Sequence, residues 1–206
     1  MAGMLVLSSV GCGRNETESS VTAGNETESS VIAGNETEGS AAAGADGGSA
    51  LVVYFSWSGN TENVAKAIAD QTGADVFEII PEEAYIDDYN ALLDIASKEK
   101  EDGARPAIAR SIEDIAQYDI IYVGYPNWWS DMPMILYTFF DSYDLSGKTI
   151  APFCTSGGSG LSGTVNSIKE LEPDADVLEG LHIGSSSASS PDQDVSDWLD
   201  RLGLAK

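Results

Sequence analysis

Residues 51–61 read LVVYFSWSGNT and join an apolar run to a polar turn. The run Leu51–Ser56 is continuous and rich in β-branched and aromatic side chains, as in a strand that is covered on both faces. Helical spacing follows over residues 63–72, and Gly73 supplies a stop signal. This stretch therefore predicts a strand, a turn and a helix in succession.

The same alternation continues to the end of the chain. Further strands are predicted at Asp75–Ile80, Asp119–Gly124, Thr149–Cys154 and Asp176–Ile183. Further helices are predicted at Asp87–Glu101, at Asp131–Ser142 with Asp131 as its cap, through Ile168 and Leu171, and at Val195–Leu202. Such alternation predicts an α/β fold, a doubly wound five-stranded parallel sheet with helices on both faces. Ligands of these sheets bind at the carboxyl ends of the strands.

The predicted domain comprises residues 50–206, and the chain before it differs in character. Residues 13–49 contain three copies of a ten-residue unit, NETESSVTAG, NETESSVIAG and NETEGSAAAG. Each copy is acidic and has almost nothing to bury, so burial cannot offset the entropy lost on ordering. We predict that this segment is a solvated, low-complexity linker.

Residues 1–12 form a short apolar segment that ends at Cys12. It resembles the end of a bacterial lipoprotein signal, in which small residues precede a cysteine that becomes lipidated. Ser9 stands where leucine is usual, and no lysine or arginine comes before it. A membrane-anchored extracytoplasmic lipoprotein is therefore one expectation. A cytoplasmic protein with a ragged terminus and a chance cysteine is the other.

Composition excludes several classes of function. The formal net charge is −24, and residues 50–206 contain 27 acidic and 9 basic side chains, so the predicted domain is itself acidic. Without a basic stripe the chain is not expected to bind nucleic acid or to dock by itself on anionic lipid. One histidine and two cysteines exclude a two-histidine metal site and a four-cysteine zinc site, and we predict no metal.

The turn after the first predicted strand, Ser56 to Thr61, concentrates hydroxyl groups and backbone amides at the start of a helix. Such a turn can hold a phosphate without a cationic side chain, because the helix dipole is positive there. It lacks the Gly-Lys-Ser/Thr of a nucleoside-triphosphate loop. An ordinary polar turn with a helix cap is the alternative interpretation.

Two adjacent tryptophans, Trp128 and Trp129, follow the third predicted strand. A large indole is costly to leave in water, and its N–H group needs a partner. One ring could pack back onto the protein. Because one tight loop cannot readily bury both rings, we expect one of them to form a wall for a flat ligand.

The loop after the fourth predicted strand, Thr155 to Gly160, is rich in glycine and hydroxyl groups. The glycines permit close approach of a ligand to the backbone, and the hydroxyl groups supply hydrogen-bond donors. Residues 158–163 also match a dinucleotide fingerprint, with Glu179 about 20 residues further on. That fingerprint normally opens the first strand–helix unit of a fold half, whereas only one strand follows here, so we reject it.

Three motifs in this order make the domain resemble the flavodoxin-like family of short-chain, FMN-binding proteins. They are YFSWSGNT at residues 54–61, GYPNWW at 124–129 and PFCTSGGSG at 152–160. The resemblance extends from about Ala50 to Gly203. It implies a sheet in the strand order 2-1-3-4-5 and noncovalently bound FMN.

The resemblance also implies which residues bind the cofactor. The phosphate would be held by Ser56, Ser58, Gly59, Asn60 and Thr61, with Trp57 on the rim of that loop. The isoalloxazine would be lined by Pro126, Asn127, Trp128 and Trp129. The polar ring edge or the ribityl chain would be reached by Thr155, Ser156, Gly157, Gly158, Ser159 and Gly160. The third loop lacks the stacking tyrosine of familiar flavodoxins, so one ring face is expected to be open.

Three functions are compatible with this sequence. The first is low-potential electron transfer by FMN to a partner with a basic docking surface, and the second is reduction of a quinone or another small acceptor by NAD(P)H. The third is a surface binding module that has lost flavin. We predict no catalytic side chain: Cys154 and His182 are interpreted as structural, and Tyr85 and Tyr89 are given little weight as a cover for the site.

Overall fold

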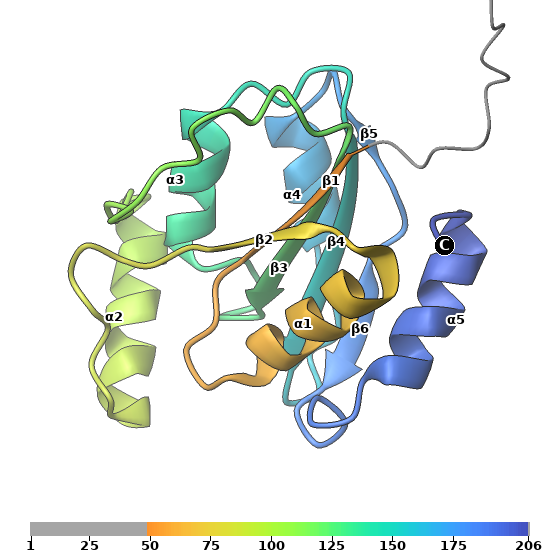
Figure 1. Ribbon diagram of the computed structural model, residues 1–206. Coiled ribbons are helices and arrows are strands. Elements are labelled where there is room, and N and C mark those ends of the chain that lie inside the picture. Colours follow the sequence, from red (N-terminus) through yellow and green to blue (C-terminus); the bar gives the residue numbers. More distant parts are fainter. Residues whose placement is uncertain (1–48, 206) are drawn as a thin grey trace, which may run out of the picture. The chain divides into compact units, whose positions relative to one another are not determined.

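The computed structural model describes residues 49–205, so residues 1–48 and Lys206 lie outside the described part (Figure 1). The expected lipidation at Cys12 and nearly all of the predicted linker fall among those undescribed residues. None of the helices between residues 49 and 205 has the length and apolar character that a membrane-spanning segment requires.

Strands and helices alternate through the described residues. The strands are β1 (Ala50–Tyr54), β2 (Asp75–Glu78), β3 (Ile120–Pro126), β4 (Thr149–Ser156), β5 (Asp176–Val177) and β6 (Leu181–Gly184). The helices are α1 (Asn60–Thr72), α2 (Tyr89–Asp102), α3 (Met134–Ser142), α4 (Thr164–Leu171) and α5 (Asp192–Leu202). The strands form one parallel sheet in the order β2-β1-β3-β4-β5, with β6 also paired to β4. This confirms the predicted α/β fold and the strand order 2-1-3-4-5.

Successive side chains of each central strand point to opposite faces of the sheet, and each face is covered by helices. Leu51 and Val53 of β1 belong to a core shared with α3 and α4. Val52 and Tyr54 belong to a core shared with α1 and α5. The continuous apolar run of β1 therefore reflects burial on both faces, as the sequence predicts.

Helix α2 lies outside α3, away from the strands, rather than over the sheet (Figure 1). Only Leu92 and Ala96 of this helix are buried, and neither belongs to the two main cores. Asp88 caps the helix by accepting a hydrogen bond from the Ala91 amide at 2.9 Å. In this lateral position α2 lines a pocket together with residues at the carboxyl ends of β3 and β4.

The fifth predicted strand, Asp176–Ile183, is divided into two short strands, which corrects the sequence interpretation. Its interruption at residues 178–180 has two causes. The carbonyl of Glu179 accepts a hydrogen bond from the buried indole of Trp198 at 3.0 Å. A β-carbon on Gly180 would lie only 3.0 Å from the Leu161 side chain and 3.1 Å from that of Val165 in α4, so the backbone passes close to the start of this helix.

The predicted cap at Asp131 is also wrong, because α3 begins at Met134. Pro133 disfavours helical backbone at Met132, and its own ψ of 143° is extended, so the helix begins only after it. The carboxylate of Asp131 instead accepts hydrogen bonds from the Met132 amide and the Tyr137 hydroxyl.

Gly124 in β3 is paired with Phe153 in β4, and the phenyl ring lies directly over it. A β-carbon at position 124 would stand 2.1 Å from Cζ of that ring. Glycine is required here because it allows the ring to cover the sheet near the carboxyl ends of the central strands.

We therefore predict that Gly124→Ala lowers the free energy of unfolding by about 1–3 kcal/mol, because the ring of Phe153 must move within a packed core. Urea denaturation of the full chain measures this change. The matched control is Gly163→Ala, since a β-carbon at that position meets nothing within 4 Å and its φ is −93°. Equal stability of the two variants would contradict the packing argument.

Candidate functional site

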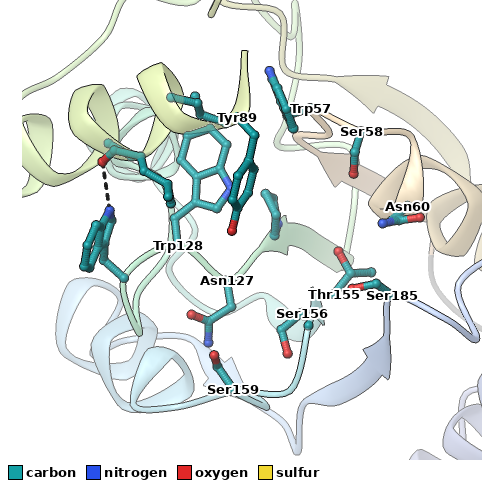
Figure 2. Close-up of a pocket in the computed structure, with 16 residues that line it drawn as sticks. Trp57, Ser58, Asn60, Tyr89, Asn127, Trp128, Thr155, Ser156, Ser159 and Ser185 are labelled. Atoms are coloured by element: carbon teal, nitrogen blue, oxygen red, sulfur yellow. Dashed lines mark hydrogen bonds between the residues drawn. The ribbon is translucent and has the colours of Figure 1, made fainter. Parts of the chain in front are cut away.

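A pocket of about 500 Å³ lies at the carboxyl ends of β1, β3 and β4, where α2 closes its outer side (Figure 2). Each of the three predicted loops contributes to it. The predicted site residues that line the pocket are Trp57, Ser58, Asn60, Pro126, Asn127, Trp128, Trp129, Thr155, Ser156, Gly157 and Ser159. The loops meet because the backbone joins their strands: the Phe55 amide donates to the Gly124 carbonyl at 3.0 Å, and the Asn127 amide donates to Thr155 at 2.9 Å.

The first loop leaves the start of α1 open to a ligand. Gly59 precedes the helix with a φ of +84°, and no side chain caps the helix amides. The hydroxyl of Ser56 accepts a hydrogen bond from the Gly59 amide at 3.1 Å, so these two residues shape the turn and do not line the pocket. Ser58 and Asn60 do line it. Free amides and polar side chains at a helix N-terminus form a site suited to an anion.

Thr61 lies beneath the pocket and does not line it. Its side chain is only 1% exposed, and its hydroxyl oxygen is 2.9 Å from that of Thr155. The contact joins the first loop to the third across 94 residues of sequence. Thr61 therefore holds two walls of the pocket together.

The second loop is a tight and strained turn. Trp128 and Asp131 exchange two backbone hydrogen bonds of 2.9 and 3.0 Å. Between them, Trp129 and Ser130 have φ angles of +53° and +62°, a conformation that costs a residue other than glycine about 1–2 kcal/mol. Strain of this kind persists only where other contacts hold it.

Contacts with α2 hold this turn. The indole N–H of Trp129 donates to the Leu93 carbonyl at 3.0 Å, the dashed line in Figure 2. The ammonium group of Lys100 donates to the Trp129 carbonyl at 2.8 Å and lies 3.2 Å from the carboxylate of Asp131. Helix α2 therefore sets the position of the exposed indole.

The two tryptophans have different surroundings. Trp128 packs edge-on against Phe55 and Tyr85, with ring centroids 5.5 and 5.3 Å apart, and one side of it borders the pocket. Trp129 remains 52% exposed. One indole is thus anchored in the core while its neighbour stands on the rim.

The third loop is shaped by its glycines and by Asn127. Gly158 and Gly160 have positive φ angles of 146° and 64°, and neither lines the pocket. The Asn127 amide group donates to the Gly160 carbonyl at 2.9 Å and to the Ser162 hydroxyl at 2.8 Å. Its carbonyl oxygen is buried without a partner, which is uncommon for a polar atom. An acceptor left in this state beside a pocket fits a ligand that carries N–H donors.

Sequence reasoning missed the part of the wall formed by α2 and by the loop after β6. The additional lining residues are Tyr89, Leu92, Leu93, Ala96 and Ser185. The phenol of Tyr89 is 63% exposed, and its ring centroid lies 6.4 Å from that of Trp57. From the sequence, Tyr89 has only little weight as a cover for the site, whereas the apolar residues of α2 are indistinguishable from ordinary core positions and give no signal at all.

The pocket has one polar end and one aromatic end. Figure 2 shows Ser58, Asn60 and Thr155 at the polar end and the rings of Tyr89 and Trp128 at the other. None of the described residues that line it is charged. Burial raises the pKa of the nearby Cys154 thiol to about 12, so this group is neither a thiolate nucleophile nor a base near neutral pH.

Comparisons with known proteins agree on the family of the fold. A family model described as Flavodoxin matches residues 49–202. A candidate flavoprotein from Bacteroides eggerthii is 34% identical, with 75% of this chain and 98% of that chain covered at a TM-score of 0.68. A second, from Bacteroides uniformis, is 32% identical, with coverages of 74% and 98% and the same TM-score.

A flavoprotein from Lactobacillus acidophilus, solved in complex with FMN, is 25% identical over 68% of this chain and 95% of that chain, with a TM-score of 0.59. The search of curated proteins finds no match.

Proposed function

The chain belongs to the flavodoxin family, and from this premise we propose that it binds FMN noncovalently in the pocket and transfers electrons at low potential. The observation that carries the proposal is the pairing of an uncapped helix N-terminus with an aromatic wall in one uncharged pocket. FMN matches both features, because it has a phosphate at one end of a flexible chain and a flat ring at the other.

The residues present fit FMN at both ends. The phosphate would bind the first-turn amides of α1, with Ser58 and Asn60 beside it. The ring would lie among Trp128, Trp129 and Tyr89, where aromatic contact stabilises a flat ligand. Bound FMN supplies the redox chemistry, while the protein supplies binding, orientation and electrostatics.

The unpartnered carbonyl oxygen of Asn127 supports the same assignment, because flavin rings carry N–H groups and this oxygen needs a donor. Tyr89 contributes aromatic surface from outside the three predicted loops, next to Trp57 of the first loop. Although the third loop lacks the stacking tyrosine of familiar flavodoxins, the pocket therefore still has a second aromatic side.

The acidic domain determines the expected redox behaviour. With 27 acidic and 9 basic residues at positions 50–206, it disfavours the extra negative charge of a reduced flavin. The same charge would steer a redox partner with a basic docking surface, at rates that fall with added salt.

Reduction of a quinone or another small acceptor by NAD(P)H is the alternative. The exposed rings of Tyr89 and Trp129 favour it, since they leave space for a second flat reactant beside the site. Steady-state NAD(P)H oxidation by the purified FMN-loaded protein separates this reductase activity from electron carriage.

Affinity for FMN can be measured by the change in visible absorbance and fluorescence when the apoprotein is titrated with FMN. Thr61→Val removes the hydroxyl that joins two loops and should raise the Kd about tenfold, the equivalent of one buried hydrogen bond. Trp129→Ala should raise it by a similar factor. Thr61→Ser keeps the hydroxyl and is the matched control.

A protein that gains no flavin spectrum would refute the proposal and support the binding module that has lost flavin. Unchanged Kd values in both Thr61→Val and Trp129→Ala would refute the placement of FMN in this pocket.

The midpoint potential of the last one-electron reduction of bound FMN should lie below that of free FMN. The difference should be about 59 mV for each 1.4 kcal/mol of repulsion between the acidic domain and the reduced flavin. High salt should raise this midpoint, because it screens the acidic surface. Anaerobic titration with redox dyes measures both effects, and a midpoint above that of free FMN would contradict the argument.

A further inference from the structure

The single histidine of the chain touches the wall of the pocket through Ser156. His182 lies on β6, and its Nε2 is 2.8 Å from the Ser156 hydroxyl oxygen at the end of β4. Ser156 is only 6% exposed and lines the pocket (Figure 2). The imidazole is therefore linked to the site by one hydrogen bond.

The hydrogen bonds of Ser156 determine which atom donates to which. Its hydroxyl oxygen accepts from the Gly158 amide at 3.2 Å and from the Gly160 amide at 3.1 Å. A hydroxyl oxygen has two lone pairs and one hydrogen. Because both lone pairs are occupied, the hydrogen must point to Nε2 of His182. The imidazole then accepts at Nε2, so it is neutral and carries its hydrogen on Nδ1.

We propose that neutral His182 is a positioning residue of the cofactor site, which holds the glycine-rich loop in shape through the hydroxyl of Ser156. The inference rests on the proposed binding of FMN, because that loop forms one side of the pocket. The hydroxyl oxygen of Ser156 binds the amides of Gly158 and Gly160 at once. By accepting the hydroxyl hydrogen, His182 keeps both lone pairs of that oxygen available to the two amides.

Protonation of His182 reverses this arrangement. Nε2 becomes a donor, and the Ser156 oxygen cannot accept from it while it accepts from both glycine amides. At least one loop contact must break, and the hydroxyl hydrogen needs another acceptor. The loop shape that suits FMN therefore requires the neutral imidazole, so proton uptake and FMN binding oppose each other.

The charged groups around His182 are few among the described residues. On α5, Asp194, Asp197 and Arg201 line a cavity at the sheet edge together with His182. On α4, Lys169 and Glu170 are exposed. Cys154, the residue paired with His182 across the sheet, is a neutral thiol because burial raises its pKa to about 12.

The pair is not the nucleophile and base of a serine hydrolase. A nucleophilic oxygen must present a free lone pair to its substrate, whereas both lone pairs of Ser156 accept hydrogen bonds from the loop. The glycine amides that would be needed to stabilise an oxyanion are occupied by the same atom. The contact therefore supports a structural linkage to the pocket.

The first test is NMR spectroscopy of the ¹⁵N-labelled full-length chain, in which one histidine makes the imidazole signals unambiguous. At about pH 8 the hydrogen should be on Nδ1, and on acidification the Gly158 and Gly160 amide signals should shift with the same midpoint as the imidazole. The glutamine of His182→Gln can accept a hydrogen bond from Ser156 but has no ionisable group, so the signals of these amides should not shift with pH in this variant. A hydrogen on Nε2, or glycine amide signals that do not change together with those of the imidazole, would overturn the proposal.

The second test compares FMN affinity at about pH 8 and about pH 5 in the wild type and in His182→Gln. Affinity of the wild type should fall more on acidification than that of the variant, because a protonated imidazole cannot accept the Ser156 hydroxyl hydrogen whereas the glutamine carbonyl still can. Ionisation of the FMN phosphate affects both proteins equally and cancels in the comparison. Parallel pH profiles would overturn the linkage.

His182→Phe removes the acceptor and should weaken FMN binding relative to the wild type at about pH 8, and wild-type affinity of this variant at that pH would count against the positioning role. If the protein binds no FMN, the proposed function fails. The NMR test on the apoprotein still decides whether His182 controls the loop.

Discussion

The buried contact between the hydroxyls of Thr61 and Thr155 is the interaction on which the site depends most directly. It joins the start of α1 to the end of β4, and so connects the loop with the helix amides to the loop with the glycines. The parallel sheet makes this contact possible, because the carboxyl ends of β1, β3 and β4 meet at one edge. The second loop joins the same edge through the backbone bond between Asn127 and Thr155.

The electrostatic contrast between the pocket and its surroundings follows from this geometry. The domain is strongly acidic, yet the pocket is lined by uncharged described residues and by the positive end of a helix. Under the proposed function, the FMN phosphate would bind without an arginine or lysine, while the flavin ring would experience a negative field from the rest of the domain. Under the proposed function, affinity for FMN and reduction potential would be set by different parts of the same molecule.

Helix α2 gives the pocket its outer wall by not covering the sheet. It packs beside α3, holds the strained Trp129–Ser130 turn through Leu93 and Lys100, and presents Tyr89 to the pocket. An apolar helix face normally indicates core, but here Leu92 and Ala96 border a cavity. The same helical pattern is consistent with either role, so the pattern alone could not reveal this wall.

Local patterns were sufficient for the order of strands and helices and for the character of the three loops, because periodicity and turn chemistry act over short stretches of chain. They were insufficient where the outcome depends on distant partners, as in the interruption at Glu179, where a carbonyl accepts a hydrogen bond from Trp198. From its sequence this protein is recognisably an alternating α/β domain with flavodoxin motifs. Only the tertiary structure placed Thr61 beneath the pocket, Tyr89 on its rim and His182 behind Ser156, because each placement depends on contacts between segments far apart in the chain.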